Sequence, residues 1–312
     1  MIVDLLLFGA GLVLLTRAAD HLVLGSARLG RRLRVSPVVI GVVVIGIGTS
    51  TPEFLVSGIA AARGENGLAV GNIVGSNILN LSLLLGIAAL IAPVPVAASV
   101  IRREVPLAVA GVLLFGLLTL SGLDARSAAA LAVAGLAALW LLIRWARAVP
   151  PEMAPAREVA GPVPGRWWAE PVRALLGLAG VLAGAQMLVV SAAAGATALG
   201  VSPAVIGFTL VAIGTSLPEL VTTVQAQRRG EPELVIGNLF GSNLFNSLAG
   251  GAVIGFAGHG GAAHGSPALV AVMMAGTLLA GLLLVRGRRL SRRHGLILGL
   301  GYLATFPLLL SA

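Results

Sequence analysis

The sequence contains no cysteine and no lysine, and only 11% of its residues are charged. The absence of cysteine excludes disulfide bonds, thiolate nucleophiles and thiolate metal sites. The low charge excludes a soluble domain, because a surface that faces water needs far more charged residues. The net charge of +9 comes from arginines scattered between apolar runs, and they form no single patch or arm. We therefore expect no nucleic acid as a partner.

Long apolar runs take the place of the missing charge. Hydrophobic residues make up 57% of the 312 residues, and the mean hydropathy is +1.00. Runs of about 20 residues, enough to cross the hydrocarbon core of a bilayer, recur along the whole chain. The sequence therefore predicts an all-α membrane protein that has the lipid bilayer as its solvent. The ten predicted transmembrane spans cover residues 3–26, 36–61, 67–92, 104–121, 126–146, 171–195, 202–226, 233–257, 267–285 and 295–311.

Short connections between the spans hold most of the arginines. If the odd-numbered connections face the cytoplasm, 18 of the 21 arginines lie on that side, which is the distribution expected of a cytoplasmic face. The others are Arg17, within the first span, and Arg63 and Arg126 on the opposite side. Both termini then face outward, and a Pro-rich segment at 147–170 is a cytoplasmic linker. The chain begins without the basic region or cleavage site of a signal peptide, so we expect the first span to be retained.

Two stretches of the chain are copies of one unit. Residues 35–80 align with 201–246 without a gap at a constant offset of 166, and 23 of the 46 paired positions are identical. Each half holds five spans, which is an odd number, so the second half is predicted to cross the membrane upside down. The predicted domains are a first repeat at 1–146, the linker, and a second repeat at 171–312. Inverted repeats are a recurrent plan of secondary transporters, with a substrate site near the membrane midplane; the alternative is a duplicated structural bundle.

Two matching polar strings interrupt the apolar spans. Gly48-Thr-Ser-Thr-Pro-Glu53 matches Gly214-Thr-Ser-Leu-Pro-Glu219, and each string ends in an acid in the middle of a span. An ionised carboxylate there costs at least about 3 kcal/mol unless it is paired or faces a water-filled cavity. No basic residue lies within one helical turn of either acid in the sequence, so a cation from solution is the expected partner. The alternative is a protonated glutamate that bonds to a neighbouring helix.

Each acid follows a proline that weakens the helix. Pro52 and Pro218 remove a backbone donor, and Gly48 and Gly214 loosen the turn before them, so the helix is predicted to break there. The freed carbonyl groups and the nearby hydroxyls offer hard oxygen ligands of the kind that Ca²⁺ and Na⁺ prefer. These hydroxyls belong to Thr49, Ser50, Thr215 and Ser216. A single Thr-Ser pair in a membrane helix more often bonds to its own backbone, so the ligand role depends on the duplication.

A second pair of polar strings follows in the next span of each repeat, at 71–80 and 237–246. Further oxygen ligands are offered by Ser76, Asn77 and Asn80, and by Ser242, Asn243 and Asn246. Ser76 and Asn80 are four residues apart and share one helix face. The Gly-xxx-Gly pairs in these strings predict close helix packing, at Gly71 and Gly75 and at Gly237 and Gly241. The roles of Asn72 and Asn238 are open between helix-to-helix hydrogen bonds and ion contact.

The two carboxylates set the charge of the predicted site at minus two. One Ca²⁺ neutralises this charge, and two or three monovalent ions can also occupy the site, as exchange requires. A transition metal would usually recruit histidine or cysteine, and the spans offer only His21, near the end of the first one. In the same span Arg17 and Asp20 are three residues apart and are expected to pair; the repeat counterpart of Asp20 is Gln186.

These duplicated motifs resemble those of the cation/calcium antiporter superfamily, in particular the prokaryotic sodium/calcium exchangers. The resemblance covers essentially the whole chain, including the ten spans, the inverted halves and the short central loop. It implies an antiporter of the prokaryotic inner membrane, not an enzyme and without a cofactor, which exchanges Ca²⁺ for Na⁺ by alternating access. It also implies a central metal site lined by Thr49, Ser50, Glu53, Ser76, Asn80, Thr215, Ser216, Glu219, Ser242 and Asn246 and by the carbonyl groups of Gly46 and Ala212.

One position departs from the family pattern. Some of these exchangers carry aspartate where this chain has Asn246, so the site holds two acids instead of three. The departure leaves Ca²⁺/H⁺ exchange through the same two glutamates as an alternative, although the proton-driven branch lacks the Thr-Ser-x-Pro-Glu string. A passive cation channel is a third hypothesis, which the paired broken helices at a repeat interface disfavour.

Overall fold

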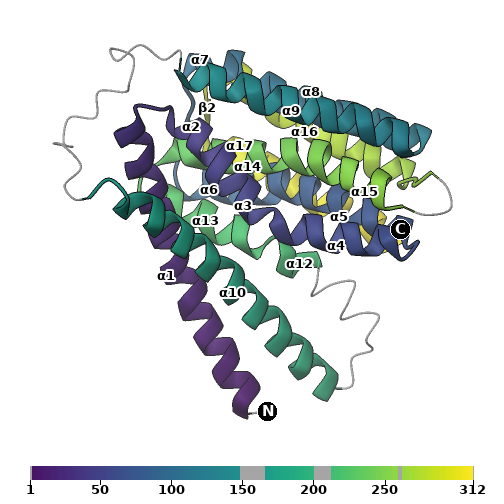
Figure 1. Ribbon diagram of the computed structural model, residues 1–312, viewed down its shortest axis with the longest axis horizontal. Helices are drawn as coiled ribbons and strands as arrows, with labels where there is room; N and C mark the ends of the chain where they lie inside the picture. The colour runs from purple at the N-terminus through teal and green to yellow at the C-terminus, as the bar shows by residue number, and fades with distance from the viewer. Residues whose placement is uncertain (1, 148–165, 200–211, 259–261, 312) are drawn as a thin grey trace.

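The computed structural model describes residues 2–147, 166–199, 212–258 and 262–311, and these residues fold almost entirely into helices (Figure 1). The first half contains α1 (Ile2–Leu33), α2 (Pro37–Ile40), η1 (Gly41–Gly46), α3 (Ile47–Thr49), α4 (Thr51–Ala62), α5 (Asn66–Leu79), η2 (Asn80–Leu84), α6 (Leu85–Ile91), β1 (Val94–Pro95), α7 (Ala98–Arg102), α8 (Glu104–Ser121) and α9 (Ala125–Arg147). The second half contains α10 (Ala169–Ala198), α12 (Ala212–Thr215), α13 (Leu217–Arg228), α14 (Pro232–Phe245), η5 (Asn246–Gly250), α15 (Gly251–Ala257), α16 (Pro267–Gly287), β2 (Arg289–Leu290) and α17 (Arg292–Ser311).

Seven of the described helices are long and apolar enough to cross a bilayer, which supports the prediction of an all-α membrane protein. The pair Pro37–Thr49 and Thr51–Ala62, bent by 44° at a break, makes an eighth candidate. Of the two remaining predicted spans, 202–226 begins outside the described residues and 295–311 lies within α17, which is not among these candidates. The number of ten therefore stays a prediction.

The two halves break into helical pieces at equivalent positions. Four pieces of the first half have counterparts whose bounds are displaced by 166 residues, the offset of the sequence repeat. The corresponding pieces are α4 and α13, α5 and α14, η2 and η5, and α6 and α15. Because the same interruptions recur in two different packing environments, they are properties of the repeated sequence.

Short backbone contacts mark the two ends of the helical bundle. Strand β1 pairs antiparallel with β2, and an isolated bridge joins Leu123 to Ala263. Helices α7 and α8 run from the first contact to the second, since β1 precedes α7 and Leu123 follows α8. We call the end that carries β1 and β2 the strand end, and the end that carries the Leu123–Ala263 bridge the bridge end.

Helices α1 and α10 lie side by side along one edge of the molecule, tilted steeply against the other helices (Figure 1). Glycines let the two backbones approach closely, as they do in many membrane helix pairs. A Cβ atom added at Gly177 would lie 2.5 Å from the backbone nitrogen of Leu22, and one at Gly184 would lie 2.6 Å from that of Leu15. The two backbones therefore approach so closely at these glycines that a Cβ atom does not fit.

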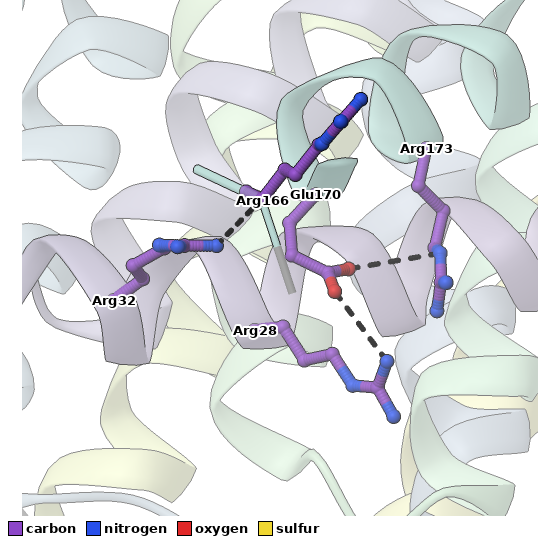
Figure 2. A network of polar contacts seen from close by, with 5 residues as sticks. All are labelled: Arg28, Arg32, Arg166, Glu170 and Arg173. Atoms are coloured by element: carbon purple, nitrogen blue, oxygen red, sulfur yellow. Dashed lines mark hydrogen bonds and ion pairs between the residues drawn. The ribbon is translucent and has the colours of Figure 1, made fainter. Parts of the chain in front are cut away.

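An ion pair and a hydrogen bond connect α1 to the amino-terminal end of α10 at the strand end. The Glu170 carboxylate of α10 lies between Arg28 of α1, at 3.4 Å, and Arg173 of α10, at 3.6 Å (Figure 2). Arg32 of α1 donates a hydrogen bond of 2.9 Å to the backbone carbonyl of Arg166. Packing and charge thus join α1 and α10 into one unit.

Helix α14 lies in the core and is buried from its third residue to its end. It packs closely on η1, because a Cβ atom added at Gly241 would lie 2.7 Å from the Cα atom of Val42. The predicted close packing is therefore confirmed for Gly237 and Gly241. A Cβ atom at Gly71 or Gly75 would meet no described atom within 4 Å, so the packing prediction is not met there by the described residues.

Candidate ion-binding site

Each predicted helix break lies at the end of a Gly-Thr-Ser string. Helix α3 ends at Thr49 and α4 begins at Thr51. In the second half, α12 ends at Thr215 and α13 begins at Leu217. Prolines occupy the first turn of α4 and of α13, where their missing N–H group costs no helical hydrogen bond. The interruption predicted before each acid is confirmed.

The breaks place both acids in the first turn of a helix, Glu53 in α4 and Glu219 in α13. The unpaired N–H groups of a first turn and the helix dipole stabilise negative charge there. Both side chains are 0% exposed, and among the described residues neither forms an ion pair. The helix ends therefore compensate only part of the cost of burying two carboxylates.

Each of the second polar strings ends at a π-helical turn. Turn η2 begins at Asn80, and η5 begins at the equivalent Asn246. A π-helical turn shifts the backbone hydrogen bonds by one residue and is often found at functional sites in proteins. Nothing in the residue pattern predicted these turns.

Hydroxyl groups from both halves of the chain converge on Glu53. Its Oε1 atom accepts hydrogen bonds from the hydroxyls of Ser216, at 3.1 Å, and Ser76, at 3.2 Å. The two hydroxyl oxygens are 3.3 Å apart, and Asn246 Nδ2 donates to Ser76 Oγ at 3.4 Å. Four of the predicted ligands thus form one cluster.

A matching cluster surrounds Glu219. The Ser50 hydroxyl donates to Glu219 Oε1 at 3.3 Å, and the hydroxyls of Thr49 and Ser242 also face this carboxylate. Ser242 donates to the Gly46 carbonyl at 3.2 Å, so this predicted carbonyl ligand lies in the same cluster. Thr49 also donates at 2.9 Å to the carbonyl four residues before it, which is the common behaviour of threonine in a membrane helix.

Four side-chain oxygens of predicted ligands have no hydrogen-bond partner among the described residues. They are one carboxylate oxygen of each glutamate and the amide oxygens of Asn80 and Asn246; the amide nitrogen of Asn80 is also buried without a partner, so no described contact joins Asn80 to either acid. All four are buried, and a buried oxygen without a partner costs about 1–3 kcal/mol. A bound cation removes this cost, and carboxylate and amide oxygens are ligands that Ca²⁺ accepts. The donor set therefore fits a hard cation.

Two predicted ligands lie on the short helix α12. Thr215 is the last residue of α12 and is 7% exposed. Ala212 is the first residue of the same helix. The carbonyl group of Ala212 and the hydroxyl group of Thr215 both stay predicted ligands.

One asparagine in each repeat holds the acid-bearing helix against its neighbour. Asn72 Nδ2 donates to the backbone carbonyl of the first acid at 3.3 Å and to Ser57 Oγ at 3.0 Å. Asn238 Nδ2 donates to the carbonyl of the second acid at 3.3 Å and to Thr223 Oγ1 at 3.1 Å. The amide nitrogens therefore make helix-to-helix hydrogen bonds. Ser57 and Thr223 were not predicted, although a hydroxyl four residues after each glutamate was a readable signal.

A cavity of about 300 Å³ lies beside the site, between α4, α10 and α12. Its walls include Pro52 and Leu55 of α4, Gln186 of α10, and Thr215. This volume holds several water molecules, each of which takes about 30 Å³ in the liquid. Because α4 runs from the break toward the bridge end, the cavity lies in the bridge-end half of the molecule (Figure 1).

The predicted pair of Arg17 and Asp20 is replaced by a different one. Asp20 accepts two hydrogen bonds from Arg229, Nε to Oδ1 and Nη2 to Oδ2, each 2.6 Å long. Arg229 directly follows α13, in the other half of the chain. The spacing of three residues between Arg17 and Asp20 makes a contact possible on a helix but does not require one. Arg229 reaches both carboxylate oxygens of Asp20, and such a two-bond contact is stronger than a single hydrogen bond.

A bundle of apolar helices, broken beside two buried acids, is the architecture of a membrane transporter for cations. The sequence model of the sodium/calcium exchanger protein family matches residues 3–146 and 171–310. The chain belongs to this family, whose members are membrane antiporters and not enzymes.

Individual relatives agree with the family match. The chain is 39% identical over 245 residues to the putative antiporter CaxA of Alkalimonas amylolytica. The aligned region covers 78% of this chain and 77% of that protein. It is also 38% identical over 239 residues to the inner membrane protein YrbG of Escherichia coli (strain K12), and this alignment covers 74% of this chain and 73% of that protein. A solved structure of the sodium-calcium exchanger NCX_Mj, soaked with 2.5 mM Na⁺ and 0.1 mM Ca²⁺, aligns over 98% of both chains with a TM-score of 0.88 and 31% identity. The protein is an integral membrane protein of the cation/calcium antiporter class.

Proposed function

We propose that this protein exchanges Ca²⁺ for Na⁺ across a prokaryotic inner membrane, through a site built on Glu53 and Glu219. The observation that carries the proposal is a pair of fully buried carboxylates, contacted by hydroxyls from both halves, with no cationic partner among the described residues. The chain has 21 arginines, but none of those that the structure describes forms an ion pair with Glu53 or Glu219. The place of the cationic partner is therefore left for an ion from solution. The similarity to NCX_Mj, a sodium-calcium exchanger, supports the same two ions.

The chemistry of the proposed ligands suits both ions. Ca²⁺ takes six to eight oxygens, and two carboxylates balance its charge while neutral oxygens complete its shell. The same minus two charge is shared by two or three Na⁺ ions when Ca²⁺ leaves. The proposed metal ligands are Glu53, Glu219, Thr49, Ser50, Ser76, Asn80, Thr215, Ser216, Ser242, Asn246, Gly46 and Ala212.

The proposal includes ten spans arranged as two inverted five-helix repeats. Strand β1 follows the third predicted span, and Ala263 follows its repeat counterpart, the eighth. Strand β1 lies at the strand end, whereas Ala263 lies at the bridge end. Equivalent connections at opposite ends of the bundle support inversion, and the matching helix bounds support the repeat.

The arginines orient this arrangement in the membrane. The strand end gathers the first, third, seventh and ninth connections, which are rich in arginine, whereas Arg63 and Arg126 belong to connections of the bridge end. The excess of arginine is typical of a cytoplasmic face. We therefore assign the strand end to the cytoplasm and the bridge end to the outside, with both termini external.

The cavity supports alternating access from an outward-open state. The residues that line the cavity on α4 and α10 have repeat counterparts, 166 residues away, on α13 and α1. These counterparts lie at the strand end, where α1 packs on α13. The described residues pack more tightly there, because Ala19, Val23 and Thr222 are at most 1% exposed. Movement of α1 and α10 against the other helices would close the outer cavity and open an equal one to the cytoplasm.

The test is uptake of ⁴⁵Ca²⁺ into proteoliposomes that contain the purified protein. We expect rapid uptake when Na⁺ is loaded inside and absent outside, and much slower uptake under an imposed pH gradient without Na⁺. The matched control is Glu53→Gln, which keeps the shape of the side chain and should give no uptake. Equal rates under the pH gradient without Na⁺ would assign H⁺ as the coupling ion, and uptake without any counter-ion would indicate a channel.

A further inference from the structure

Two ion pairs connect the α1–α10 unit to the rest of the protein at the strand end. Asp20 of α1 binds Arg229 through two hydrogen bonds of 2.6 Å. Arg31, three turns further along α1, lies 3.2 Å from Glu231. Arg229 and Glu231 both belong to the turn between α13 and α14. The bond to Asp20 raises the pKa of Arg229 above its usual range, so this arginine stays charged.

These pairs differ in kind from the ones within the unit. The pair of Glu170 with Arg28 joins α1 to α10, and the pair with Arg173 lies within α10, so both move together with the unit (Figure 2). The pairs made by Asp20 and Arg31 cross from the unit to the α13–α14 turn. A displacement of α1 along α13 would open the strand end. It must therefore break the pairs made by Asp20 and Arg31, whereas the pairs made by Glu170 stay intact.

The repeat offset shows what the opposite end offers instead. The offset holds for this helix pair, because Gly11 packs against Leu188 as Gly177 packs against Leu22. The counterparts of Asp20 and Arg229 are Gln186 and Arg63, and those of Arg31 and Glu231 are Thr197 and Glu65. At the bridge end, each of these two pairs of counterpart residues contains one charged side chain and one neutral side chain. When the bridge end closes, these positions cannot form an ion pair.

We propose that the Asp20–Arg229 pair, assisted by Arg31–Glu231, is a latch that holds the strand end closed and favours the outward-open state. The inference rests on the proposed alternating access. The two closed states would otherwise be related by the repeat and similar in energy, and the latch stabilises one of them only. Loss of the latch should raise the population that is open at the strand end by about two- to tenfold, the range of an ion pair that is partly exposed but held by two hydrogen bonds.

Cysteine accessibility tests the latch without any need for transport, because the natural chain has no thiol. Val221 on α13 is the counterpart of Leu55, which lines the outer cavity and is 60% exposed. A cysteine at Val221 should react with a water-soluble maleimide slowly in the otherwise unchanged protein in lipid nanodiscs. We expect Asp20→Asn and Arg229→Gln each to raise this rate by about two- to tenfold.

Three comparisons separate a latch from general loosening. The double variant of Asp20→Asn and Arg229→Gln should react no faster than either single one, because both remove the same pair. The charge exchange, Asp20→Arg with Arg229→Asp, should restore slow labelling. Labelling of a cysteine at Leu55 should not rise in any of them, since a partly unfolded protein would expose both sites. Arg102→Gln, an exposed arginine on α7, serves as the matched control.

An unchanged labelling rate at Val221 in both single variants overturns the proposal, and so does a charge exchange that labels as fast as they do. Ca²⁺ uptake by the protein with natural side chains is measured separately. If uptake depends on Na⁺ but labelling does not change, the latch is wrong and the proposed function stands. If labelling changes as expected but Na⁺ drives no uptake, the latch stands as a conformational device and the choice of ions is wrong.

Discussion

The hydroxyl of Ser216 donates a hydrogen bond of 3.1 Å to the carboxylate of Glu53, 163 residues away in the chain. The reciprocal bond runs from Ser50 to Glu219, 3.3 Å long and spanning 169 residues. Each acid is thus contacted by the serine that precedes the other acid. The site is therefore shared between the two halves, and a movement of one broken helix changes the surroundings of both carboxylates.

We expect Glu53→Gln and Glu219→Gln each to abolish Ca²⁺ exchange while folded protein remains in the membrane. Glutamine keeps the shape and removes the charge that offsets ion dehydration. Loss of a charged contact is worth about 3 kcal/mol, or about a hundredfold in affinity. The measurement is ⁴⁵Ca²⁺ exchange by purified variants, with size-exclusion chromatography as the control for folding. Near-normal exchange by either variant would contradict the assignment of the site.

Alanine at Ser50 or Ser216 should weaken exchange less than glutamine at the acids. Each hydroxyl is a neutral donor to one carboxylate, and such a hydrogen bond contributes about 0.5–1.5 kcal/mol. The expected result is an apparent Ca²⁺ affinity lowered by about two- to tenfold, to a similar extent in both variants. Ser121→Ala provides the comparison, since its hydroxyl bonds only to its own helix. A loss in either site variant as large as that in Glu53→Gln would give these serines a greater role than that of neutral ligands.

A third acid at the site should make exchange sensitive to protons. Asn246 lies at the start of η5 with its amide oxygen unpartnered among the described residues. In Asn246→Asp the new carboxyl stands near two other acids, so it must hold a proton or recruit another cation. We expect the rate of this variant to fall as the pH is lowered from about 8 to 6, because protons then compete with Ca²⁺ and Na⁺. Exchange by the protein with Asn246 should stay nearly flat over the same range; equal pH profiles of the two proteins would refute the idea.

The sequence predicted the parts of the site that depend on local chemistry. The break at Ser50, the matching one at Ser216 and the burial of both acids follow from glycine and proline placed before an acid in an apolar run. The duplication supplied the second half of the argument, since a single Thr-Ser pair is weak evidence. These predictions needed no knowledge of distant contacts.

Features that depend on packing between distant segments were missed. Asp20 has Arg17 near it in the sequence but binds Arg229, which is 209 residues away, because helix packing decides which guanidinium reaches the carboxylate. The π-helical turns at Asn80 and Asn246 were missed for a different reason, although they recur in both repeats. A shift of backbone bonding by one residue leaves no trace in hydrophobic periodicity, and an apolar run reads the same with or without it.

The close packing of α1 and α10 should be sensitive to single methyl groups. A Cβ atom at Gly177 would lie 2.5 Å from the backbone nitrogen of Leu22, so Gly177→Ala forces the two helices apart. Overpacking of this kind costs about 1–3 kcal/mol, which for a chain of 312 residues corresponds to about 2–5 °C in melting temperature. The matched control is Gly9→Ala on α1, where an added Cβ meets no described atom within 4 Å and alanine favours the helix. Thermal unfolding of the purified proteins in detergent measures the difference. We expect Gly9→Ala to melt at or slightly above the temperature of the unchanged protein and Gly177→Ala well below it; equal melting temperatures for the two variants would mean that α1 and α10 are not held together by this contact.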